Sequence, residues 1–230
     1  MKRFKGWLIP AFMVVVFTGF VSVDEAYGQL DTILKRMDDH NKALVSIRAK
    51  VTMSKQNAQL GGSPDIVKGN VIYKAIKGRN AADVRVDWIK PEENFSIIGD
   101  QYIIYRPRLN QVIKGSTKNA GGNAKAGGAL AFMNMSRGQL KANYSVVYLG
   151  EATLASGVVA WHLRLTPKQP TSYKSAEIWV DQNGMPNQSK VIENNNDSTT
   201  ILLESIEKNI RLEKNAFKIA YPKNAREVKG

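Results

Sequence analysis

The chain has 230 residues, contains no cysteine and carries a formal net charge of +13. The lack of cysteine excludes disulfides, thiolate metal sites and thiol nucleophiles, and it excludes lipidation on a cysteine after the N-terminal apolar run. Lysine and arginine are spread along the whole sequence, so the charge does not indicate nucleic-acid binding. A basic surface would either favour approach to anionic lipid head groups, by ~1 kcal/mol per basic residue near a membrane, or serve solubility alone.

The N-terminus has the three-part layout of a secretory signal peptide. Basic residues precede an apolar run over residues 7–21, and the small-x-small pattern Ala-Tyr-Gly follows at 26–28. The run is broken by Pro10 and is shorter than the ~20 residues that span a bilayer, so a retained anchor is the weaker alternative. We therefore expect residues 1–28 to be a cleaved signal peptide and residues 29–230 to form one domain, exported to the periplasm.

Helical periodicity gives way to strand periodicity after the first part of this domain. Apolar residues at helical spacing predict an amphipathic helix over residues 30–44, and a period of two begins at Ser46. A glycine-rich loop over 115–128 interrupts the strands. About 11 strands are predicted, near 46–54, 70–74, 83–88, 95–98, 102–105, 109–113, 144–149, 158–166, 176–180, 189–192 and 199–203.

A sheet of this size cannot stay flat, because neighbouring strands twist by ~20° relative to one another. The fold class is therefore mainly β with α, built on a strongly curved antiparallel sheet with an apolar concave face. Each CH₂ group buried there would contribute ~0.8 kcal/mol, so acyl chains could bind without hydrogen bonds. The predicted lining of this lipid cavity is Val51, Met53, Val71, Tyr73, Val84, Val86, Trp88, Trp161, Leu163, Leu165 and Ile178.

A short apolar segment follows the glycine-rich loop and is predicted to be a helix of low stability. It contains Leu130, Phe132, Met133, Met135 and Leu140. Methionine beside phenylalanine on a tethered segment is compatible with ordinary core, and equally with an adaptable lid over the cavity. The lid hypothesis assigns that role to Leu130, Phe132, Met133 and Met135.

No pattern in the sequence indicates catalysis or metal binding. The two histidines are isolated: His40 is expected on the exposed side of the first helix, and His162 lies in a strand, pointing opposite to Trp161. A Gly-x-Ser-x-Gly nucleophile motif is absent. We expect no enzyme, no catalytic residue, no cofactor and no metal site.

Several segments, taken together, resemble the LolA family of periplasmic outer-membrane lipoprotein carriers. The resemblance covers nearly all of residues 30–225, and the family's closing strand and proline turn correspond to Asn215–Ile219 and Pro222. The other matching segments are GNVIYK at 69–74, RVDW at 85–88, YRP at 105–107, WHLRLTPK at 161–168, EIWVD at 177–181 and GMPN at 184–187.

This resemblance implies an unclosed β-barrel covered by an N-terminal helix and a short lid helix. It implies a soluble carrier, which we expect to be a monomer, that binds lipoprotein acyl chains and needs no cofactor. Its implied partners are an inner-membrane lipoprotein-releasing transporter and an outer-membrane acceptor. The family locks its lid with an arginine in an Arg-Pro pair; the candidates here are Arg79, which lacks the proline, and Arg85.

Two other functions remain open. The same fold could serve as a lipid- or lipoprotein-sensing binding domain of an envelope stress pathway, although such sensors usually carry an extra domain, for which we expect no room. A hydrolase would have to assemble its site from scattered residues.

Overall fold

A computed structural model describes residues 23–76, 82–117 and 135–230 of the chain. The expected signal peptide therefore lies mostly outside the described residues. The described part is dominated by one sheet of twelve strands, flanked by two α-helices and a short 3₁₀ helix, η1 (Pro107–Leu109). None of the described helices is both long and apolar enough to cross a membrane.

The sheet is made of two meanders that meet in its centre. The first is β1 (Ser46–Gln56), β2 (Asp65–Ala75), β3 (Ala82–Trp88), β4 (Glu93–Ile98), β5 (Gln101–Arg106) and β6 (Gln111–Ser116). The second is β7 (Tyr144–Thr153), β8 (Val159–Pro167), β9 (Tyr173–Asp181), β10 (Pro186–Glu193) and β11 (Ser198–Lys208). Antiparallel pairing of β1 with β11 joins them, and β12 (Arg226–Lys229) adds to β6 in parallel.

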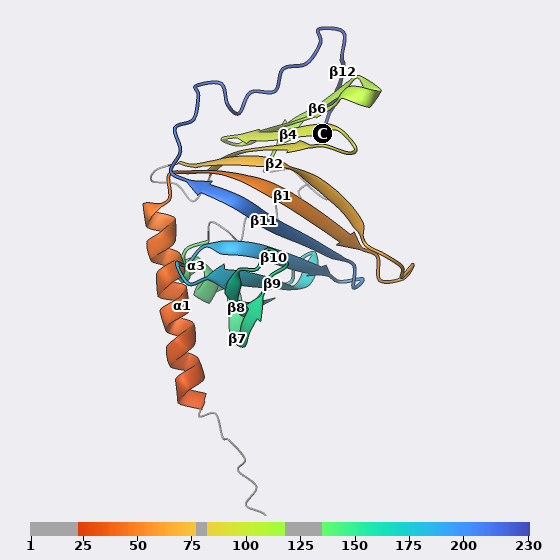
Figure 1. Ribbon diagram of the computed structural model, residues 1–230. Coiled ribbons are helices and arrows are strands. Elements are labelled where there is room, and N and C mark those ends of the chain that lie inside the picture. The colour runs from red at the N-terminus through yellow and green to blue at the C-terminus, as the bar shows by residue number, and fades with distance from the viewer. Residues whose placement is uncertain (1–22, 77–81, 118–134) are drawn as a thin grey trace, which may run out of the picture.

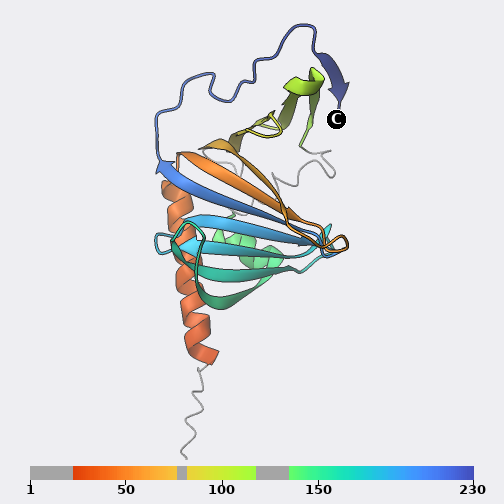
Figure 2. The same ribbon diagram turned by 45° about the vertical axis from the view of Figure 1, so that its right-hand side comes forward.

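The resulting strand order is β12-β6-β5-β4-β3-β2-β1-β11-β10-β9-β8-β7, so β12 and β7 are the two edges of an unclosed sheet among the described strands. Figures 1 and 2 show that the sheet is strongly bent. The predicted fold class is confirmed. The strand missing from the prediction is β12, which has no buried residue and which forms by pairing with the edge of β6.

Strand alternation places the apolar side chains on one face. Directly paired residues lie on the same face of a sheet, and the pairs Met53↔Ile201, Ile201↔Ser189, Ser189↔Ile178 and Ile178↔Leu163 form a row across five strands. Four of these five residues are apolar and buried, and Ser189 is also buried. We call this the inner face.

Both helices pack on the inner face of the second meander. Helix α1 (Val23–Ala43) begins seven residues before the predicted 30–44 helix and ends one residue earlier. Its Ile33, Leu34 and Met37 have no exposed surface and share a cluster with Leu163. Helix α3 (Arg137–Asn143) contributes Leu140 to the same cluster. The buried positions of α1 follow the helical period, so this helix presents an apolar stripe to the sheet.

The C-terminal segment 209–225 lies on the opposite, outer face and passes from β11 to β12 (Figures 1 and 2). The hydroxyl of Ser96 donates to the carbonyl oxygen of Phe217 at 2.6 Å, and Phe217 and Ile219 are buried. The prediction of a closing strand at Asn215–Ile219 is wrong. Outer-face side chains of β3 and β4 hold the segment, and residues 209–225 do not form a strand of the sheet.

Candidate functional site

The inner face carries two apolar clusters that together contain every predicted cavity residue. Five of them, Val51, Met53, Val71, Val86 and Trp88, are buried members of the first cluster, and Tyr73 and Val84 pack against it. Trp161, Leu163, Leu165 and Ile178 belong to the second cluster. The structure therefore brings the predicted residues to one face of the bent sheet, from both meanders.

Other residues extend these clusters beyond the predicted set. The hairpins after β3 add Phe95, Tyr102 and Ile104, and β11 adds Ile201 and Leu203. Their strands were predicted, and their period of two was the signal that could have placed them. From α1, Ile33, Leu34 and Met37 could be recognised in the sequence only as the apolar stripe of a helix. The strands that they contact are distant in sequence.

Most of the predicted lid lies outside the described residues. Leu130, Phe132, Met133 and the candidate Arg79 belong to that part of the chain. Met135 is described: it packs against the second cluster, and its carbonyl oxygen accepts a hydrogen bond from the Asn41 side chain at 3.0 Å. The lid role of these residues stays a prediction.

Arg85, the second lid-locking candidate, points to the outer face. Its guanidinium contacts Asp87 at 3.0 Å and donates to the carbonyl oxygens of Ala216 and Lys218 at 3.2 and 2.9 Å. These contacts connect β3 to the C-terminal segment. A role of Arg85 in locking a lid stays a prediction.

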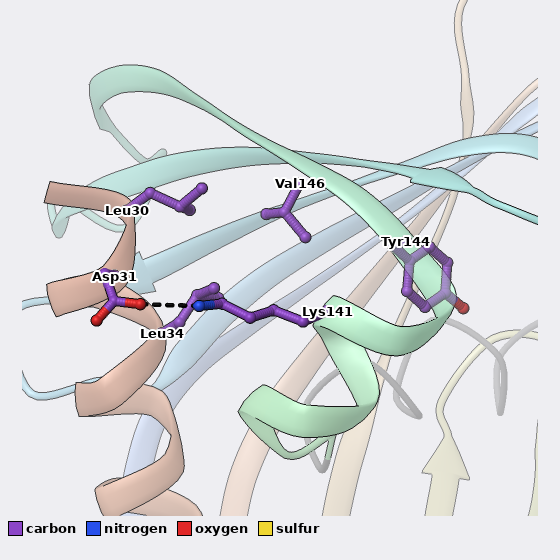
Figure 3. A pocket seen from close by; sticks show the side chains of 6 residues that line it. All are labelled: Leu30, Asp31, Leu34, Lys141, Tyr144 and Val146. Atoms are coloured by element: carbon purple, nitrogen blue, oxygen red, sulfur yellow. Dashed lines mark hydrogen bonds and ion pairs between the residues drawn. The ribbon is translucent and has the colours of Figure 1, made fainter. Parts of the chain in front are cut away.

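A pocket of about 390 Å³ lies between α1, α3 and the edge strand β7. In Figure 3, Lys141 of α3 extends toward Asp31 of α1, while Tyr144 and Val146 come from β7. The complete lining is Leu30, Asp31, Leu34, Lys141, Tyr144 and Val146. Four of the six side chains are mainly apolar, so the pocket has an apolar wall and one charged pair.

The charged pair links the two helices. The Asp31 carboxylate accepts a hydrogen bond from the Lys141 ammonium at 2.8 Å and another from the Arg137 guanidinium. The hydrogen bond from Lys141 is the main cause that lowers the pKa of Asp31 below its ordinary value. All three side chains are a third to a half exposed, so solvent and solutes reach them.

Further contacts fix α3 along α1. The backbone N–H of Arg137 donates to Asp38 at 3.4 Å, and Asp38 is also paired with Lys42 at 2.7 Å. Ser136 caps α3 by accepting from the Gln139 backbone N–H, while the Gln139 side chain accepts from the Ser136 N–H. This capping box starts a helix of only seven residues at a defined place beside α1.

His40 differs from its prediction. It lies in α1, but its Nε2 atom is buried and has no hydrogen-bond partner among the described residues. Burial is the main cause that lowers the pKa of His40 to about 4, and Lys208 contributes. The expectation of an exposed histidine is wrong: His40 is half-buried, and Lys208 at the end of β11 and Asp181 at the end of β9 lie close enough to affect its pKa.

His162 points to the outer face, as predicted. Its ring stacks on Trp179 with the ring centroids 4.2 Å apart, and Nε2 lies 3.2 Å from the buried Glu177 carboxylate, which also accepts from Arg164. These contacts account for the histidine as a structural residue. Within the described ranges, no group of three or more acidic or histidine side chains could hold a metal ion.

Comparisons with known proteins agree with this architecture. A family model described as outer membrane lipoprotein carrier protein LolA matches residues 81–220. No curated protein matches the chain.

Solved structures share the fold at low sequence identity. An uncharacterized conserved protein from Thermus thermophilus is 15% identical, with a TM-score of 0.54 over 88% of this chain and 99% of that chain. MucB is 13% identical, with a TM-score of 0.53 over 84% of this chain and 63% of MucB. The family match spans more than half of the sequence, and the unclosed twelve-stranded sheet with its helical cover accompanies it. The chain therefore belongs to the LolA family of outer membrane lipoprotein carrier proteins.

Proposed function

We propose that this protein is a periplasmic carrier that holds the acyl chains of lipoproteins against its inner face and moves them from the inner to the outer membrane. The observation that carries the proposal is the apolar inner face, to which both meanders contribute, in a chain of the LolA family. Binding of acyl chains to such a face depends on buried area, at ~0.8 kcal/mol per CH₂ group. Lipoproteins that share acyl chains but differ in sequence would therefore all be cargo.

The proposal includes residues 1–28 as a signal peptide and residues 29–230 as the single carrier domain. Its partners would be an inner-membrane lipoprotein-releasing transporter and an outer-membrane acceptor, as in the family. Support for the apolar site comes from the placement of the predicted lining residues on the inner face. The proposed chemistry is binding and release, with no bond made or broken.

A charge placed on the inner face tests the proposal. Val84 lies on the inner face and Ile72 on the outer face; they are half-buried, and their strands β3 and β2 are neighbours. The pair Val84→Glu and Ile72→Glu therefore makes the same charge change on opposite faces. The protein is mixed with a triacylated lipoprotein in detergent, the detergent is removed, and the lipoprotein that stays soluble is measured.

We expect the wild-type protein and Ile72→Glu to keep the lipoprotein soluble and Val84→Glu to lose most of this activity. Circular dichroism and thermal melting confirm that each variant is folded before it is compared. Equal protection by both variants, or no protection by a folded wild-type protein, would refute the proposal.

A further inference from the structure

The pocket between α1, α3 and β7 combines an apolar wall with a cationic rim. Leu34 is fully buried, Tyr144 is 7% exposed, and Leu30 and Val146 pack against the same cluster. The volume of about 390 Å³ falls within the ~300–1,000 Å³ that is usual for small-molecule sites. A ligand that fits this wall must have an apolar tail.

The rim has more positive than negative charge. Arg137 and Lys141 share the one carboxylate of Asp31. Lys168 adds a third cation, because its ammonium donates to the backbone carbonyl of Lys141 at 2.6 Å. Toward the C-terminal end of α1, the next acid on this side is Asp38, which already has its own cation in Lys42 at 2.7 Å. Among the side chains that the structure describes, the rim therefore holds three cations to the one carboxylate of Asp31, which favours an additional anion.

The ion pairs at this rim can exchange. The Asp31 and Lys141 side chains are 49% and 50% exposed, and exposed pairs contribute little to stability because solvent screens them. An incoming phosphate or carboxylate group would meet the same two donors that Asp31 now uses. Asp31 thus occupies the place of a ligand anion and competes with it.

We propose that this pocket binds the acyl tail of a lipid with an anionic head group, and that the head group replaces Asp31 as the partner of Lys141 and Arg137. The tail lies along Leu30, Leu34 and Val146. The site adjoins the inner face, because its apolar lining packs on the second cluster, but binding of a free lipid there requires no lipoprotein. It provides a contact for a free anionic lipid at the edge of the sheet, beside α3.

The test measures binding of two single-chain lipids to the full-length protein by isothermal titration calorimetry, at lipid concentrations below micelle formation. Lyso-phosphatidylglycerol is the anionic probe and lyso-phosphatidylcholine the zwitterionic one, with inorganic phosphate as a third arm. Asp31→Asn removes the competing carboxylate and Lys141→Gln removes a cation. Asp39→Asn and Lys35→Gln are matched controls, since this exposed pair lies on α1 at another position and makes the same charge changes.

Asp31→Asn should tighten binding of the anionic lipid by about two- to fivefold, and Lys141→Gln should weaken it by a similar factor, as expected for partly exposed ion pairs. The control variants should stay within about twofold of the wild type, within the spread of surface substitutions. Binding of the zwitterionic lipid should not respond to any of these four changes.

The tail contact is tested by Val146→Phe, which fills the pocket, against Val147→Phe, whose side chain is on the other face of β7 and 50% exposed. Only the first should weaken binding of the anionic lipid. Three results would overturn the proposal. Asp31→Asn could bind the anionic lipid no more tightly than the wild type, or Lys141→Gln could change the affinities for both lipids equally. Inorganic phosphate could also bind as tightly as the anionic lipid. If Lys141→Gln loses binding of the anionic lipid but still keeps the lipoprotein soluble, the two binding functions are independent. If only the lipoprotein assay fails, the proposed function is refuted and this lipid site is not.

Discussion

The guanidinium of Arg85 donates a hydrogen bond to the carbonyl oxygen of Lys218, 2.9 Å away, and so attaches the C-terminal segment to the outer face of β3. The same group contacts Ala216 and Asp87, and the Arg85 side chain is only 26% exposed. One side chain therefore joins β3 to the C-terminal segment. This arrangement stabilises the segment that leads to β12.

Replacement of Arg85 by leucine should release that segment. Hydrogen bonds from a charged group contribute ~1.5–3 kcal/mol, so we expect a loss of about 2 kcal/mol in the free energy of unfolding. Hydrogen exchange should rise in residues 209–225. Arg48→Leu is the control, since Arg48 is 54% exposed and paired only loosely with Glu207 at 3.4 Å. Faster exchange in residues 135–143, with none in 209–225, would instead support the lid-locking role of Arg85.

Gly184 sets how closely α1 approaches the sheet. A Cβ atom at this position would overlap the carbonyl group of Arg36, and the backbone φ is +83°. Gly157 has a nearly identical φ of +82° with no atom within 4 Å, so Gly157→Ala isolates the backbone cost, ~1 kcal/mol. Gly184→Ala should cost at least about 2 kcal/mol more, because a close-packed contact must open. If Gly184→Ala and Gly157→Ala lower the free energy of unfolding in urea by the same amount, α1 can move away at this contact without cost.

Stability should depend on pH through His40. Burial lowers the pKa of His40 from 6.5 to about 4 in the folded state, so the unfolded chain binds the proton more readily between these values. The free energy of unfolding should therefore fall as the pH falls from about 6.5 toward about 4. His40→Asn should reduce this decline, whereas His162→Asn, which removes the other imidazole, serves as the control. Identical urea-unfolding profiles for the wild type and His40→Asn at pH 7 and pH 5 would contradict this prediction.

The capping box of α3 should determine whether this short helix forms. Ser136→Ala removes the side chain that accepts from the Gln139 N–H, and loss of an N-cap costs ~1 kcal/mol. We expect faster hydrogen exchange in residues 137–143 and a smaller effect on global unfolding. Ser145→Ala, an exposed serine just after α3, is the matched control. Unchanged exchange in α3 of Ser136→Ala would mean that the packing of Leu140 and the contacts with Asp31 and Asp38 hold the helix without its cap.

The parts of the fold that were predictable from sequence are those encoded by local periodicity. Trp161, Leu163 and Leu165 alternate with polar residues, so their strand and its buried face could be assigned directly. Burial of His40 was missed although its spacing indicated it, since His40 lies three residues after Met37 and seven after Ile33, on the apolar stripe of the helix. β12 was not predictable, since its Arg-Glu-Val-Lys sequence has no apolar alternation and pairs with a distant edge.

The site shows the same division. The apolar residues of the inner face follow from strand alternation, which is local. The Asp31–Lys141 contact joins residues that are 110 positions apart, and it depends on how α3 is placed against α1. No sequence spacing encodes that distance, so the pocket at the edge of the sheet could be found only from the structure.

The central claim is that the inner face of the bent sheet holds acyl chains. Native mass spectrometry of the protein isolated from its own cells tests this most directly. We predict a bound species whose mass is that of an acylated ligand, present on Ile72→Glu and absent from Val84→Glu. A folded wild-type protein that carries no such ligand, and that takes none up when acylated lipoprotein is supplied, would contradict the claim.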